Sequence, residues 1–60
     1  MMTVIDAIRK YGLKDSAKHY KDAFGNSHDT DIPLDELMCK KVKAITIYPF
    51  YDEAEIVIII

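Results

Sequence analysis

The side chains suited to binding a metal ion lie in the middle of the chain. His28, Asp29, Asp31 and Cys39 offer an imidazole, carboxylates and a thiol, which are ligand types that transition metals use in proteins. Their spacing matches no metal-binding signature. In the alternative interpretation the first three are loop and cap residues, and Cys39 is a small buried apolar residue. A lone cysteine also excludes an internal disulfide and a four-thiolate zinc site. Because the four residues lack ligand spacing, we expect no metal and no cofactor.

A second group of side chains has the spacing of an acid/base pair. Asp15, His19 and Asp22 fall at i, i+4 and i+7, so on a helix a carboxylate could orient the imidazole for proton transfer. No nucleophile or oxyanion site accompanies them. The alternative is a solvated helical face with ordinary charge pairs. We therefore expect no enzymatic activity.

Basic residues of the N-terminal half suggest a different chemistry, contact with a nucleic-acid backbone. If both N-terminal segments are helical, their basic residues form one predicted face, which consists of Arg9, Lys10, Lys14, Lys18 and Lys21. Residues 7–20 resemble a helix-turn-helix with its turn at Tyr11-Gly12-Leu13, although Ile8 and Lys18 stand where that motif has a small and a buried aliphatic residue. The net charge of −2 disfavours nonspecific nucleic-acid binding. A small DNA- or RNA-binding regulator is therefore the alternative functional prediction.

Aromatic residues crowd the connection between two predicted strands. The candidate protein-binding residues are Tyr48, Phe50, Tyr51, Asp52 and Glu53. Exposed aromatics beside acids are typical of a binding hot spot and also suit a basic nucleic-acid groove on a partner. The alternative is that these rings close the end of the core. We expect a small non-enzymatic interaction module that binds and regulates or inhibits a larger protein, by analogy with accessory proteins of phages and mobile elements.

Local signals predict the helices that position these residues. Thr3 and Asp6 form a capping box and Gly12 follows Tyr11, so a first helix is expected over residues 4–11. The second is predicted over residues 13–24, because Leu13, Ala17, Tyr20 and Phe24 repeat at helical spacing. Residues 25–31 consist almost entirely of turn formers. Pro33 then suits the start of a third, short helix.

The C-terminal third predicts an antiparallel hairpin. Residues 42–48 and 55–60 are rich in β-branched side chains and are separated by Pro49 and a turn. The terminal run is apolar on both faces and so needs cover on both. We expect it to pair with another chain through residues Ile56, Val57, Ile58, Ile59 and Ile60. A homodimer with a shared sheet is the first choice for this association.

Size limits the architecture to one small α+β domain over residues 1–60, with helices packed on the hairpin. Chains of this length bury a small core and are marginally stable without a disulfide, a metal or a partner. We therefore expect association with another chain to supply the missing stability. Residues 1–7 include Asp6 and lack a basic region followed by an apolar one, so we expect no signal peptide, and no apolar run of the sequence is long enough to cross a bilayer. We expect a cytoplasmic protein without membrane contact.

Overall fold

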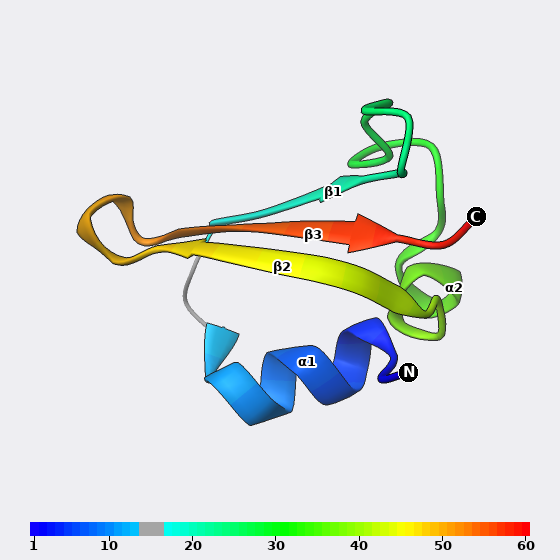
Figure 1. The fold of residues 1–60 in the computed structure, drawn as a ribbon. Helices are drawn as coiled ribbons and strands as arrows, with labels where there is room; N and C mark the ends of the chain where they lie inside the picture. Colours follow the sequence, from blue (N-terminus) through cyan, green and yellow to red (C-terminus); the bar gives the residue numbers. More distant parts are fainter. Residues whose placement is uncertain (14–16) are drawn as a thin grey trace.

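The chain forms a three-stranded mixed sheet with one face covered by helix (Figure 1). The computed structural model describes residues 1–13 and 17–60. The elements in chain order are α1 (Val4–Tyr11), β1 (Ala17–Lys21), α2 (Leu34–Met38), β2 (Val42–Tyr48), the 3₁₀ turn η2 (Pro49–Tyr51) and β3 (Glu53–Ile58). The predicted α+β class is confirmed.

Helix α1 has the bounds predicted from its caps. Thr3 Oγ1 accepts a hydrogen bond from the Asp6 backbone N–H at 3.3 Å, and Asp6 Oδ2 accepts one from the Thr3 N–H at 3.2 Å. The helix ends at Gly12, whose φ of 63° is left-handed and whose N–H donates to the Ile8 carbonyl. Its Val4 and Ala7 side chains are fully buried against the sheet.

The second predicted helix is wrong, because residues 17–21 form strand β1. β1 pairs in parallel with β3, in a register that places Tyr20 opposite Ile56. The residues expected to form its apolar helical stripe do not share a surface: Tyr20 is buried, whereas Ala17 and Phe24 are exposed. Hydrogen bonding to a distant part of the chain therefore overrides the helical spacing.

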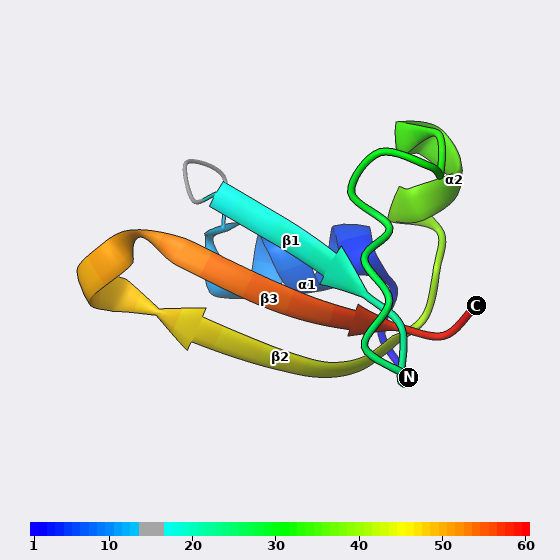
Figure 2. The same cartoon turned by 90° about the horizontal axis from the view of Figure 1, so that it is seen from above.

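Strand β3 lies in the centre of the sheet, between β1 and β2 (Figure 2). It pairs in parallel with β1 and antiparallel with β2, with a bulge at Lys43 of β2. Both edges of β3 are thus occupied, and the prediction that the terminal run pairs with another chain by extending the sheet is wrong. Ile56 and Ile58 instead belong to the core, which consists of Val4, Ala7, Leu13, Tyr20, Leu37, Val42, Ala54, Ile56 and Ile58.

The sheet face opposite α1 is mainly polar. Side chains alternate along β3, so Glu53, Glu55 and Val57 point to this face while Ala54 and Ile56 point to the helix. Lys21 Nζ lies 3.4 Å from Glu55 Oε2 across the β1–β3 pair. The expected two-sided apolar strand is absent from the described residues, because β3 begins at Glu53 and ends at Ile58, before the last two isoleucines.

Candidate functional site

The connection between β2 and β3 forms a hairpin tip that projects beyond the end of α1 (Figure 1). Pro49 ends the strand since it has no N–H for the ladder, and residues 49–51 make one 3₁₀ turn. Asp52 reverses the chain with a left-handed φ of 51°. Its carbonyl accepts a hydrogen bond from the Ala17 N–H at 2.9 Å, so the tip is joined to the start of β1.

The aromatic side chains of this tip point to solvent. Phe50 is 96% exposed and Tyr51 75% exposed, while Tyr48 is more than one-third exposed. The neighbouring Asp52 and Glu53 are exposed as well. The alternative in which these rings close the end of the core is therefore wrong. Phe50 and Tyr51 therefore contribute little to the core, and the hairpin tip presents them together with two acids.

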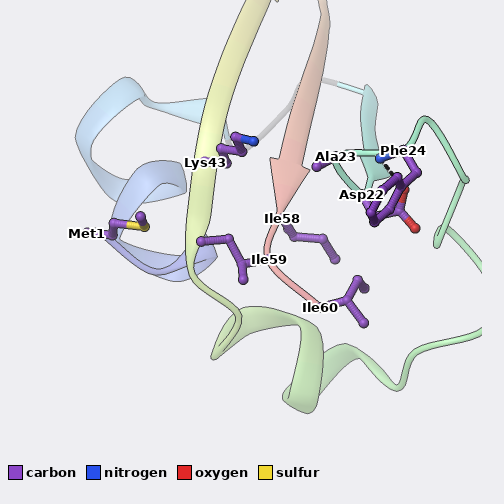
Figure 3. Close-up of a pocket in the computed structure, with 8 residues that line it drawn as sticks. All are labelled: Met1, Asp22, Ala23, Phe24, Lys43, Ile58, Ile59 and Ile60. Carbon is purple, nitrogen blue, oxygen red and sulfur yellow. Dashed lines mark hydrogen bonds between the residues drawn. The ribbon is translucent and has the colours of Figure 1, made fainter.

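A second exposed apolar surface lies at the opposite end of the sheet (Figure 3). It is a groove of about 520 Å³ lined by Met1, Asp22, Ala23, Phe24, Lys43, Ile58, Ile59 and Ile60. Phe24 is 91% exposed there, and Ile59 and Ile60 follow the end of β3 with partly exposed side chains. The five residues predicted to act together in association are thus divided between the core, the polar face and this groove.

The loop after β1 is organised by three histidine–aspartate contacts. His28 Nε2 lies 2.8 Å from Asp22 Oδ2, and His28 Nδ1 lies 2.9 Å from Asp31 Oδ2. His19 Nδ1 lies 3.2 Å from Asp29 Oδ2. Hydrogen bonding to Asp22, and then to Asp31, raises the pKa of His28 above 6.5.

The carboxylate of Asp22 makes several of the hydrogen bonds that hold this loop. Its carboxylate also accepts hydrogen bonds from the backbone N–H groups of Phe24 at 2.8 Å and Asn26 at 3.0 Å. Together with the bond from His28, which is the strongest influence, these hold the pKa of Asp22 at about 2. The arrangement is that of an Asx turn stabilised by contact with the His28 imidazole, which is a structural role.

The predicted metal ligands do not converge. His28 and Asp31 are in contact, but Asp29 turns toward β1, where Oδ1 accepts a hydrogen bond from the Tyr20 N–H at 2.6 Å. Cys39 is exposed at the end of α2. Within residues 1–13 and 17–60, no three histidine, cysteine or acidic side chains are grouped so as to hold a metal ion.

The predicted basic helical face is also wrong. Arg9 and Lys10 lie on α1, but Lys18 and Lys21 lie on β1, where an odd separation places them on opposite faces of the sheet. Lys18 Nζ donates to the Leu13 carbonyl at 3.2 Å, and Lys21 contacts Glu55. Lys14 lies outside the described residues, as does Asp15 of the predicted acid/base set. His19 and Asp22, the described members of that set, bind different partners.

Comparisons of the chain with models of protein families, with curated proteins and with solved structures find no match. None of the helices in the described residues has the length and apolar character needed to span a bilayer.

Proposed function

We propose that this protein is a small non-enzymatic interaction module whose hairpin tip binds a larger protein and regulates or inhibits it. The binding residues are Tyr48, Phe50, Tyr51, Asp52 and Glu53. The observation that supports this most is the near-complete exposure of Phe50 and Tyr51 on a projecting turn. A small protein with one exposed binding surface is typical of the accessory proteins of phages and mobile elements. The comparison with them is an analogy between classes of protein.

The energetics of the tip favour binding to a protein. Burying one large apolar side chain contributes roughly 1.5–3 kcal/mol, and two adjacent rings supply an anchor of the kind found at interface hot spots. The 3₁₀ turn and the hydrogen bond from Ala17 to the Asp52 carbonyl hold the backbone before binding, which lowers the ordering cost.

The acids define the kind of partner surface. Asp52 and Glu53 flank the rings, so a matching surface has an apolar pocket with lysine or arginine at its rim. A nucleic-acid groove on a larger protein has this character, and occupying it would inhibit that protein. A tip with acids at this position disfavours direct contact with a phosphate backbone.

Affinity capture from a lysate of the encoding organism, with identification by mass spectrometry, tests this proposal. The variant Phe50→Ala/Tyr51→Ala should lose the captured protein yet keep the fold by circular dichroism, since neither ring is buried. Phe24→Ala is a matched control, because it removes an equally exposed ring at the other end of the sheet.

The proposal then requires direct binding by the purified pair. A partner retained by Phe24→Ala and lost by the tip variant supports it; a partner bound equally by both variants contradicts it. Titration with salt is the second readout. Binding of the parent to DNA or RNA with a steep salt dependence, unaffected by the tip substitutions, would instead identify a nucleic-acid-binding regulator.

A further inference from the structure

The two outer edges of the sheet differ in how their backbone groups are satisfied. On β1, the Tyr20 N–H donates to Asp29 Oδ1 at 2.6 Å and the Tyr20 carbonyl accepts from the His28 N–H at 2.8 Å. The loop after β1 therefore blocks that edge. In the described part of the chain, β3 is the only strand that pairs with β2, and the other edge of β2 is occupied only at its start, where the Val42 N–H donates to the Met2 carbonyl at 2.8 Å.

The register shows which groups of β2 are available. The Ala17 N–H donates to the Asp52 carbonyl, so the even-numbered residues of β3 bond to β1 and the odd-numbered ones to β2. Their partners on β2 are Ala44, Thr46 and Tyr48. The N–H and C=O groups of the two residues between them, Ile45 and Ile47, consequently point outward.

The middle of the free edge lacks the features that prevent strand pairing. Residues 44–48 contain no charge and no proline, whereas natural edge strands are commonly protected by lysine, proline or a bulge. The bulge at Lys43 and the ring of Pro49 limit the open stretch at either end. A groove of about 290 Å³ runs beside it, lined by Ile45 and Ile47 and by Met2 and Tyr11 near the two ends of α1.

We propose that the outer edge of β2 pairs antiparallel with β2 of a second copy, about a two-fold axis at Thr46. Ile45 of each copy then lies opposite Ile47 of the other, and each such pair exchanges both backbone hydrogen bonds. A two-fold axis at Ile47 would put Ile45 opposite Pro49, which cannot donate. An axis at Ile45 would put Ile47 opposite the bulge at Lys43.

Side chains and charges favour a second copy as the occupant. In this register Ile45 of one copy faces Ile47 of the other beside the grooves, and the small side chain of Ala44 faces Tyr48. No two side chains of like charge lie opposite each other. The antiparallel arrangement also brings the basic start of β2, with Lys41 and Lys43, toward the acidic tip of the other copy, with Asp52 and Glu53. The segment is thus complementary to itself.

Phe50 and Tyr51, the anchors of the proposed binding site, lie outside the paired residues 44–48, so the dimer leaves these two rings accessible, whereas Tyr48 lies within the pairing. The two hairpin tips lie at opposite ends of the joined sheet, so one assembly carries two tips. Loss of the dimer and loss of tip binding are separate results, because the edge and the tip are altered by different substitutions.

Charge substitutions at Thr46 test the axis. Thr46 is exposed on the polar face opposite Glu55, so Thr46→Lys suits the single copy but places two lysines together in the dimer. We expect the dissociation constant to rise by roughly tenfold or more for Thr46→Lys and for Thr46→Glu, and an equimolar mixture of the two to recover the dimer. The control His19→Lys sits opposite the same Glu55 on the other side of β3 and should not change the mass.

Light scattering and sedimentation equilibrium over a range of concentrations measure the mass, and circular dichroism verifies folding. A parent that stays monomeric throughout overturns the proposal, as does a dimer insensitive to both Thr46 variants. A monomer whose affinity for another protein depends on Thr46 also overturns it and assigns the edge to that protein.

A disulfide provides a second measurement that does not depend on charge. Residues at the two-fold axis would form a non-hydrogen-bonded pair with Cα atoms about 4.5 Å apart, within disulfide reach. The Cys39→Ser/Thr46→Cys variant should therefore form a covalent dimer under mild oxidation, and Cys39→Ser/His19→Cys should not. Equal crosslinking of both, or of neither, contradicts the two-fold axis at Thr46.

Discussion

At the residue scale, His28 holds the loop after β1 through both nitrogens of its ring. Each nitrogen contacts a carboxylate, which an imidazole can satisfy with two donated hydrogen bonds only when it is protonated. The raised pKa of His28 and the lowered pKa of Asp22 are two consequences of the same contact. Folding stability should therefore depend on pH in a defined window.

The pH dependence has opposite signs for the two groups. Stability from Asp22 is present above its ordinary pKa of 3.8 and is lost as pH falls toward about 2. Stability from His28 is complete below its ordinary pKa of 6.5 and is lost as pH rises through the higher pKa of the folded state. The contribution of the pair should thus be largest between about pH 4 and 6.5.

Replacing His28→Gln tests this window. The variant should melt at a lower temperature than the parent at pH 5.5, and the difference should shrink as pH rises above 7. Thermal melts followed by circular dichroism at a series of pH values measure both curves. His19→Gln is the control, because the contact of His19 with Asp29 is longer and more exposed. A constant difference across the pH range would show that His28 stabilises the loop without its charge.

The same loop shows why the grouping of polar residues in sequence misleads. His28, Asp29 and Asp31 are close together in the chain and suggest a ligand set, but Asp29 bonds to the edge of β1. The contact that most strongly shifts the pKa of His28 is with Asp22, at the other end of the loop. Chain reversal within the loop brings these two together, and no local spacing signals it.

At the element scale, β3 organises the molecule because it pairs with both other strands. Its Ile56 is fully buried between Tyr20 of β1 and Ile45 of β2 in the register of the sheet. The apolar C-terminal run, which was predicted to pair with another chain, instead contributes residues 56–58 to the central strand. Its β-branched residues suit that position, where each side chain on the helix face contacts neighbours on two strands.

Substitution of Ile56→Ala should therefore lower the free energy of unfolding by about 2–5 kcal/mol, from lost burial and the cavity left behind. Since this can unfold so small a domain, Ile56→Val provides a graded variant with an expected loss of about 0.5–1.5 kcal/mol. Urea denaturation measures both. Phe50→Ala is the control, with an expected change within about 0.5 kcal/mol. A loss for Phe50→Ala comparable to that for Ile56→Ala would contradict the exposure of the tip.

At the scale of the whole molecule, a single helical layer covers one face of the sheet, and α2 closes one end of the core with Leu37. A domain of this size has little stability to spare. Pairing through the edge of β2 would satisfy the outward N–H and C=O groups of Ile45 and Ile47 and shield the groove beside them. Association and folding stability should consequently be linked.

The melting temperature of the parent should therefore rise with protein concentration, because only the folded state dimerises. For Thr46→Lys the same dilution series should give a nearly constant midpoint, and for His19→Lys it should follow the parent. Differential scanning calorimetry at matched concentrations makes this comparison. A parent midpoint independent of concentration would show that the single copy carries all the stability.

The sequence by itself determined the features that rest on neighbouring residues. The capping box and Gly12 set the bounds of α1, Pro33 precedes α2, and Pro49 ends β2. The aromatic and acidic composition of the hairpin tip was visible for the same reason. Each of these signals acts through steric limits or hydrogen bonds within a few residues. The local sequence is therefore sufficient to predict these features.

Only the tertiary structure decided what residues 17–21 become and where β3 lies. Leu13, Ala17, Tyr20 and Phe24 have helical spacing, yet a strand forms because parallel pairing with β3 supplies hydrogen bonds from the far end of the chain. That single event separates the basic residues, makes the terminal run central, and leaves β2 as the free edge. Strand order depends on non-local pairing, and the spacing of residues along the chain does not encode it locally.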